Sequence, residues 1–187
     1  MYANPDIKVF QNKYELVNDR KEKIYSYAFP SLDNQFKALC SGNFMACIGG
    51  FLHREVYTKI QFDTTRELTG SEDYEYWLRL GKSGVRFAYL EEKLAGSRLY
   101  AENKTLGARV KVHKEINDMF KKSFAKVPDR WLLNYAHAVV ESKIDRRLHP
   151  MRFVIQIGWR TILASFRWNR SFSVDMQNRI FIWARKM

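Results

Sequence analysis

Two adjacent carboxylates, Glu72 and Asp73, stand where the sequence predicts the start of a helix. Ser71 before them is a favourable N-cap, because its hydroxyl can accept a free backbone N–H of the first turn. Acidic residues in that turn are also favoured by the positive end of the helix dipole. Apolar residues follow at the i, i+3, i+4 spacing of one buried helical face: Tyr74, Trp77 and Leu78. We therefore predict a helix that begins at Glu72, packs this face inward and leaves the carboxylates at its open end.

Short motifs surround the Glu-Asp pair in a fixed order. They are Gly50-Phe51-Leu52-His53-Arg54-Glu55, Phe62-Asp63, Glu72-Asp73 with Trp77-Leu78-Arg79-Leu80, Gly84, and Ser97-Arg98-Leu99-Tyr100 with Asn103 and Thr105. In order and spacing this set resembles the second half of a family 2 glycosyltransferase of the GT-A fold, over about half of the chain. Two positions depart from the family pattern: Gln61 stands where a glycine is usual, and Tyr100 where a histidine is common.

The resemblance implies an enzyme that moves a sugar from a nucleotide-diphosphate sugar to an acceptor hydroxyl. Asp73 matches the family's general base, which takes the proton of the attacking hydroxyl. Glu72, Gly49 and Gly50 are expected to border or orient the acceptor, and Arg98 is a candidate contact for the diphosphate. The acceptor would be a glycan or a lipid-linked saccharide.

The plainer alternatives stay open for each of these residues. Asp73 as a helix-terminal acid that only complements the dipole would contribute about 0.3–1 kcal/mol. Trp77 fits a core residue better than a sugar-stacking platform, and Arg98 fits an exposed arginine at a strand end nearly as well as a phosphate ligand. Most of residues 38–52 fit a core strand and turn.

No Asp-x-Asp occurs in the sequence. In the family this motif, in the nucleotide-binding first half, holds the metal and the sugar diphosphate. We therefore expect a chain that lacks the donor-binding half, carries no metal of its own and binds a nucleotide sugar only together with that half. Mg²⁺ or Mn²⁺ is expected for the complete family enzyme, and the isolated chain would be truncated and possess uncertain activity.

The elements that must position this site are predicted as follows. Residues 7–17 and 24–27 form a β-hairpin around an Asn18-Asp19 turn, with a bulge near residues 11–13, where the alternation slips phase. Pro30 ends the second strand, and residues 33–39 are a short helix or loop. The uncharged residues 38–52 are predicted as a buried strand. A short helix over 53–60, the helix from Glu72 ended by Gly81 and Gly84, and a strand over 85–90 complete this half.

From residue 106 onward the periodicity predicts amphipathic helices. The first includes Ile116, Met119 and Phe120, and a second spans 131–147 after a break at Pro128-Asp129. A third spans 151–168 and aligns Met151, Ile155, Trp159, Ile162 and Phe166, with Arg152, Arg160 and Arg167 elsewhere on its circumference. A fourth begins near Ser173. The fold class is thus α/β: a partial GT-A-like fold over residues 1–105, with a short mixed sheet and helices, followed by an α-helical extension over 106–187.

Basic charge is concentrated in that extension. Residues 1–100 hold 14 Lys/Arg against 13 Asp/Glu, and residues 101–187 hold 18 against 7, a net of +11. A solvated basic surface, an anionic membrane surface and a nucleic acid are three interpretations. Arginines interleaved with aromatics suit an interfacial helix, whereas no nucleic-acid-binding motif is found, so nucleic acid is not an expected partner. A non-catalytic module that docks on a membrane or an anionic partner is the alternative function.

Cysteine and histidine usage argues against a metal or disulfide framework. Cys40 and Cys47 lie in an uncharged stretch and are interpreted as small buried hydrophobes, which fits a reducing compartment. The histidines have no ligand-type partner at helical spacing, so no metal site is predicted. The sequence has neither a secretion-signal pattern nor an uncharged run near the roughly 18 residues of a spanning helix. A cytoplasmic protein is expected, with peripheral association at the inner membrane face as an option.

Overall fold

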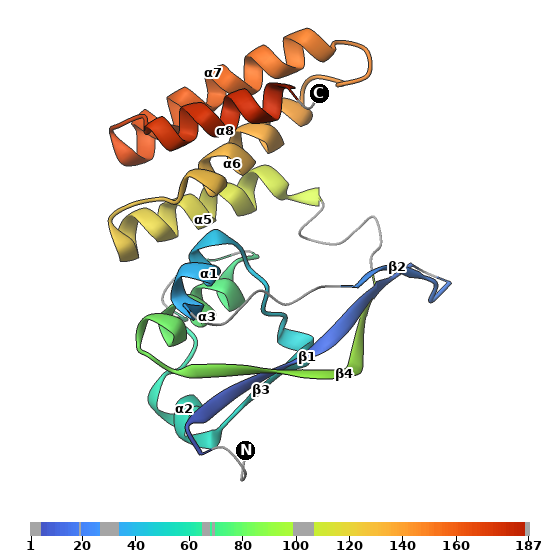
Figure 1. Ribbon diagram of the computed structural model, residues 1–187, viewed down its shortest axis with the longest axis vertical. Helices are drawn as coiled ribbons and strands as arrows, with labels where there is room; N and C mark the ends of the chain where they lie inside the picture. The colour runs from blue at the N-terminus through green and yellow to red at the C-terminus, as the bar shows by residue number, and fades with distance from the viewer. Residues whose placement is uncertain are drawn as a thin grey trace. The chain divides into compact units, whose positions relative to one another are not determined.

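The computed structural model describes residues 5–18, 20–26, 34–64, 68, 70–98 and 107–185 of the chain. The chain divides into two compact units, Met1–Gly107 and Ala108–Met187. Within the described residues the first unit combines a sheet with helices and the second is helical (Figure 1). The predicted α/β class, with a short mixed sheet and a helical second part, is confirmed.

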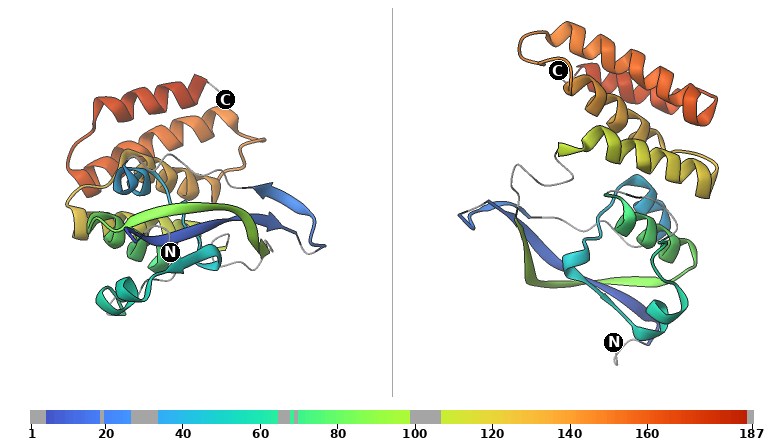
Figure 2. Two further views of the ribbon diagram at one scale, coloured as in Figure 1. Left: turned by 60° about the horizontal axis from the view of Figure 1, so that its bottom comes forward. Right: turned by 180° about the vertical axis from the view of Figure 1, so that it is seen from behind.

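Strand β1 (Ile7–Val17) is the strand to which the other described strands pair. Strands β2 (Lys23–Ser26) and β3 (Gly50–Leu52) pair antiparallel with different stretches of β1, and β4 (Arg86–Arg98) pairs with it in parallel. Both views in Figure 2 show β4 running along β1. The sheet is therefore mixed, and β1 links the stretch before the central helix to the strand after it.

The predicted N-terminal hairpin is present. Asn18 organises its turn, since the side-chain Oδ1 accepts the backbone N–H of Arg20 at 3.0 Å and of Glu22 at 2.8 Å. Lys21 adopts a positive φ of 62° within the same turn. Asp19, Tyr27, Pro30 and Asp33, which also entered the prediction of this region, lie outside the described residues.

The β1–β4 register is irregular within the stretch where loss of alternation predicted a bulge. Asn12 pairs with Leu90, Lys13 with Lys93 and Tyr14 with Ala95, so the extra residues lie on β4: Glu91, Glu92 and Leu94. The location was predicted correctly from β1, although the inserted residues belong to its partner. Within this stretch the consecutive residues Gln11 and Asn12 are both fully buried, which regular alternation would not allow when one face is exposed.

The predicted strand over residues 38–52 is wrong for most of its length. Residues 38–41 end helix α1 (Gln35–Ser41), whose N-cap Asn34 accepts the Lys37 N–H at 2.9 Å. A 3₁₀ turn, η1 (Cys47–Gly49), follows, and only β3 pairs in the sheet. The absence of charge correctly indicated burial at Leu39 and Met45, but a short apolar run cannot distinguish helix from strand.

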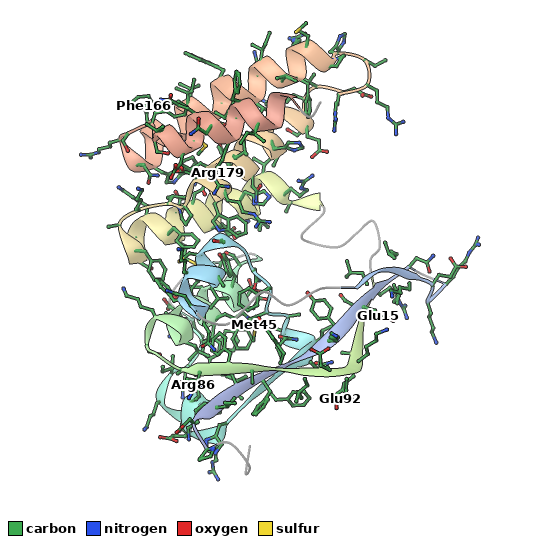
Figure 3. All side chains as sticks on the ribbon, in the orientation of Figure 1. Glu15, Met45, Arg86, Glu92, Phe166 and Arg179 are labelled. Atoms are coloured by element: carbon green, nitrogen blue, oxygen red, sulfur yellow. The ribbon has the colours of Figure 1, made fainter. Side chains whose placement is uncertain are left out.

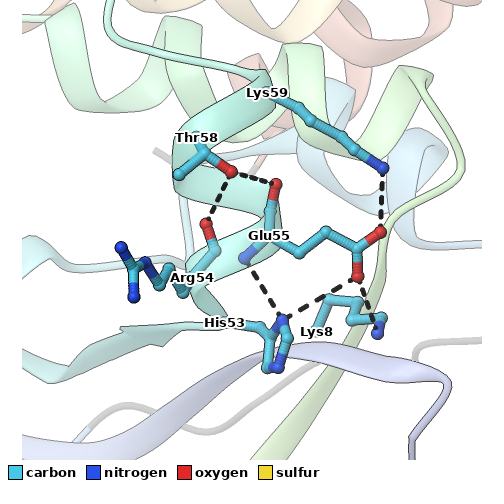
Figure 4. A network of polar contacts seen from close by, with 6 residues as sticks. All are labelled: Lys8, His53, Arg54, Glu55, Thr58 and Lys59. Atoms are coloured by element: carbon cyan, nitrogen blue, oxygen red, sulfur yellow. Dashed lines mark hydrogen bonds and ion pairs between the residues drawn. The ribbon is translucent and has the colours of Figure 1, made fainter.

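Helix α2 (Arg54–Lys59) matches the short helix predicted over 53–60. Its N-cap His53 accepts the Glu55 N–H through Nδ1 at 3.3 Å. Glu55 also bonds Lys59 at 2.8 Å and pairs with Lys8 of β1 at 3.2 Å (Figure 4). These two ammonium groups lower the pKa of the Glu55 carboxyl to about 2, with the Lys59 hydrogen bond as the largest cause. The network joins the helix to the first strand.

Helix α3 (Glu72–Lys82) begins at the predicted residue and buries the predicted face. Tyr74, Trp77 and Leu78 are each no more than 2% exposed. Glu75 is also buried, and its carboxylate accepts the Arg79 Nε–H at 2.8 Å. This intrahelical pair satisfies a charge that burial would otherwise make costly.

The prediction that Gly81 helps to end α3 is wrong, because Gly81 lies within the helix and packs against α1. A Cβ added there would lie 2.9 Å from Leu39 Cδ1. Gly84 ends the segment as predicted, with a φ of 80°. The strand predicted over 85–90 extends to Arg98, since charged contacts such as Lys93 to Glu15 at 2.7 Å continue the pairing with β1.

In the second unit, helices α5 (Arg109–Phe124) and α6 (Asp129–Glu141) bury Ile116, Met119 and Phe120, as predicted, together with Leu132 and Ala136. Helix α6 begins at the predicted Asp129 break and ends before residue 147, the predicted end. Burial lowers the pKa of His113 on α5 to about 4, with Arg109 and His137 adding to the effect. Its imidazole is therefore neutral at pH 7.

Helix α7 (Pro150–Asn169) spans the predicted third helix, and α8 (Val174–Arg185) begins beside Ser173, whose hydroxyl accepts the Met176 N–H at 3.0 Å. The apolar face of α7 that packs inward carries residues not aligned in the sequence analysis: Phe153, Ile157, Thr161, Ala164 and Trp168. Of the aligned residues, Met151, Ile155, Trp159 and Phe166 are exposed. Helix α7 is therefore apolar on two faces.

Candidate functional site

The first turn of α3 fixes the backbone of both candidate acids, because the buried aromatic face of the helix anchors the residues that follow. Glu72 is exposed and Asp73 is partly buried. Asp73 Oδ1 accepts the backbone N–H of Tyr74 at 2.6 Å. This contact takes one of the free amides of the helix start.

Ser71 occupies the predicted cap position but does not perform the predicted capping. Its side chain makes no cap hydrogen bond, is 1% exposed, and its Oγ has no partner among the described residues. The aspartate beside it takes the Tyr74 amide instead. The start of the helix was therefore predicted correctly, but the side chain that accepts a free N–H of the first turn belongs to Asp73 and not to Ser71.

Asp73 lies against the η1 turn. Its Oδ2 is 3.7 Å from Cys47 Sγ, which donates to it. Desolvation by burial raises the pKa of the Asp73 carboxyl above its usual value, and the neighbouring Glu72 charge adds to the rise, while the Tyr74 N–H and the Cys47 thiol oppose it. A carboxylate whose proton affinity is raised in this way is a better base than an exposed one.

Cys47 is held as a thiol by the same arrangement. Desolvation is the largest cause that raises its pKa to about 11, and the charges of Asp73 and Glu72 act in the same direction. The residue is exposed, and it is a free cysteine. The expectation that Cys47 is a buried hydrophobe is therefore wrong, whereas Cys40 is intermediate in exposure. A protonated thiol is a donor to Asp73 rather than a nucleophile.

Gly49 and Gly50 connect this turn to the sheet, and at both positions a side chain would approach neighbouring side chains too closely. A Cβ on Gly49 would lie 2.2 Å from Asn12 Oδ1 and 2.4 Å from Gln11 Nε2. A Cβ on Gly50 would lie 3.2 Å from the Trp77 ring. The glycines thus allow the turn to approach both β1 and α3 closely, which holds Cys47 beside Asp73.

Arg98 is not brought to this cluster. It is the exposed last residue of β4 and pairs with Val17, whereas Gly50 pairs with Gln11. Gln11 and Val17 are six positions apart on β1, about 20 Å at a rise of about 3.3 Å per residue. The motif residues that follow it, Leu99, Tyr100, Asn103 and Thr105, lie outside the described residues.

Polar groups of three residues lie behind the site. Gln11 and Asn12 were not proposed as site residues in the sequence analysis, and Trp77 was interpreted there as a core residue. Gln11 Oε1 accepts the Ala46 N–H at 3.0 Å and so fixes the start of η1. Asn12 Oδ1 and Trp77 Nε1 are buried with no partner among the described residues. The loss of polar–apolar alternation near residues 11–13 was the sequence signal for the Gln11-Asn12 pair, because it indicated a local departure from regular strand geometry.

Metal-binding clusters of three or more His, Cys, Asp or Glu residues are absent from the part of the chain that the structure describes. An open groove is lined by residues of α1, the end of α3 and the start of β4: Asn34, Gln35, Phe36, Gly81, Gly84, Val85, Arg86 and Phe87. This groove lies at the opposite end of α3 from Asp73, and Asp73 is not among its lining residues.

No protein-family model, curated protein or solved structure matches this chain. Among the described residues, no helix has both the length and the apolar character needed to cross a membrane.

Proposed function

We propose that this chain forms the acceptor-side part of a family 2-like glycosyltransferase, in which Asp73 is the general base. The observation that carries the proposal is the environment of Asp73: a desolvated carboxylate with raised proton affinity, held on an anchored helix start beside a glycine-bordered turn. The ordered motifs around it, which resemble the family, add the reaction class.

In the proposed reaction, the acceptor hydroxyl approaches the Asp73 carboxylate within hydrogen-bond reach. Asp73 takes the proton as the acceptor oxygen bonds to the anomeric carbon of the donor sugar, and the bond from that carbon to the nucleoside diphosphate breaks. The Cys47 thiol and the Tyr74 N–H orient the carboxylate, because the thiol donates to Oδ2 and the N–H donates to Oδ1. Glu72 is proposed as an exposed acceptor contact on the same turn.

Donor binding is assigned differently. Because the sequence carries no Asp-x-Asp, the proposal places the sugar diphosphate and its Mg²⁺ or Mn²⁺ on residues outside these 187. The diphosphate needs a counter-ion and a pocket, and Asp73 is assigned neither role.

Nucleoside diphosphate release tests the proposal. The chain, alone and fused to a donor-binding half, is incubated with uridine, guanosine and thymidine diphosphate sugars, Mn²⁺ and a saccharide or lipid-linked acceptor pool. Asp73→Asn should lower transfer by about 10²–10⁴-fold without changing the melting temperature. Glu72→Gln is the matched control and should lower transfer far less. Transfer by Asp73→Asn at the unmodified rate, or no transfer in any arm, would contradict the proposal.

A further inference from the structure

Helix α7 carries a second apolar face that no described element covers. Opposite the residues that pack against α6 through Val140, Phe153 and Ile157, five large side chains are 44–75% exposed. We call them the outer stripe: Met151, Ile155, Trp159, Leu163 and Phe166. Figure 3 labels Phe166 on this helix. A helix that is apolar on both faces usually has a partner for each.

The outer stripe is continuous along the helix. Its members recur at intervals of four, four, four and three residues, so at about 100° per residue they fall within one arc of about 120°. From Met151 to Phe166 the stripe extends about 22 Å at 1.5 Å per residue. Its occupant must therefore accept a long, narrow apolar ridge and not a single side chain.

The charge around the stripe has one sign. Helix α7 contains no Asp or Glu. Residues 142–173 contain seven Lys/Arg, at 143, 146, 147, 152, 160, 167 and 170, against Asp145 alone, a net of +6. On the helix circumference, Arg152, Arg167 and Arg160 fall within about 60° of Leu163. A basic flank thus follows one edge of the apolar arc.

This combination favours a lipid surface over other anionic partners. An interfacial helix needs an apolar stripe parallel to its axis with Lys or Arg beside it, so that the stripe enters the headgroup–acyl boundary while the charges meet lipid phosphates. A nucleic acid would contact the arginines and Trp159, but its backbone offers nothing to the aliphatic side chains of Met151, Ile155 and Leu163. We propose that α7 docks lengthwise on an anionic membrane surface through its outer stripe. The proposal is independent of the role of Asp73.

Vesicle co-sedimentation of the full chain tests this. We expect binding to phosphatidylcholine vesicles containing phosphatidylserine, weaker binding as salt is raised, and little binding to pure phosphatidylcholine. Arg152→Gln with Arg160→Gln should weaken partitioning by about 25-fold at low salt, about fivefold for each arginine. The matched control removes two exposed positive charges from α5, Lys111→Gln with Lys122→Gln, and should weaken partitioning much less.

The apolar contribution has its own pair of variants. Trp159→Ala with Leu163→Ala keeps a good helix former at each site and should weaken partitioning by at least tenfold. Tyr57→Ala with Leu94→Ala removes side chains that are 58% and 61% exposed elsewhere and should leave partitioning unchanged. Circular dichroism checks that each variant is folded.

Three outcomes would overturn the proposal. Equal binding to neutral and anionic vesicles would remove the charge argument. Binding to single-stranded DNA that is lost in the Trp159 and Leu163 variant, without vesicle binding, would assign the surface to nucleic acid. No vesicle binding at low salt would mean that the stripe is covered by residues 1–107 or by a second copy, which light scattering would distinguish.

Discussion

At the residue scale, the two glycines of the η1–β3 junction have a packing requirement that can be measured. Gly49 approaches Asn12 and Gln11, which are both fully buried and hydrogen-bonded to neighbouring backbone. Gly49→Ala therefore forces buried amides to move and should lower the free energy of unfolding by about 1–3 kcal/mol. Denaturant titration measures the change.

The control for this substitution lies on β4. A Cβ on Gly96 would meet its nearest atom at 4.0 Å, the Glu15 carbonyl oxygen, and Gly96 is exposed. Gly96→Ala should be neutral or slightly stabilising, because alanine lowers the conformational entropy of the unfolded chain. Equal losses for the two variants would show that any alanine at these positions is harmful and that the Gly49 contact is not special.

The residues of the candidate site were predictable to different extents. Glu72 and Asp73 were identifiable because an acidic pair before an apolar helical face has a local signature. Asn12 and Gln11 had only the loss of alternation in β1 as a signal, because contacts such as that of Gln11 Oε1 with the Ala46 N–H join residues 35 positions apart in the sequence. Desolvation by burial raises the pKa of Asp73, and that burial arises from tertiary packing that no local sequence pattern shows.

At the element scale, α2 is joined to β1 by a pH-sensitive contact. The pKa of Glu55 is lowered to about 2 in the folded chain from 4.5, so its ion pairs stabilise the fold fully above pH 4.5. That contribution is lost as the pH falls from 4.5 toward 2, because the folded carboxylate then takes up its proton. Glu55→Gln removes the charge at every pH.

The melting temperature of the unmodified chain should therefore exceed that of Glu55→Gln at pH 7, and the difference should shrink as pH approaches 2. Glu92→Gln, a change of the same charge at an exposed position on β4 labelled in Figure 3, is the control and should show no such trend. A difference that is constant with pH would exclude the Glu55 ion pairs as its source.

Helix prediction succeeded where the periodicity was long. Among the short helices, α2 was predicted, whereas the last residues of α1 were predicted as a strand. The sixteen-residue and twenty-residue helices α5 and α7 repeat their apolar pattern over several turns. The sequence alone could not say which of the two apolar faces of α7 is covered, because both Phe153 and Met151 begin helical repeats. Burial of the first depends on α6.

At the scale of the whole molecule, the second unit, Ala108–Met187, is held together by hydrogen bonds among its own helices and loops. Trp168 Nε1 donates to Asp118 Oδ1 at 2.7 Å, which joins α7 to α5. Asn169 exchanges two hydrogen bonds of 2.9 Å with the backbone of Val127. Ser173 Oγ donates to Asp129 Oδ2 at 2.6 Å and links the approach to α8 with the start of α6.

These contacts predict that residues 108–187 fold without the first unit. Phe153 and Ile157 pack against Val140 within this unit, and Asp118 supplies the hydrogen-bond partner of the Trp168 indole in the same unit. The fragment should give a helical circular dichroism spectrum and a cooperative thermal transition. Trp168→Phe should lower its midpoint, since Asp118 then loses a hydrogen bond worth about 1–3 kcal/mol. A random-coil spectrum for the fragment would mean that residues 1–107 supply part of its core.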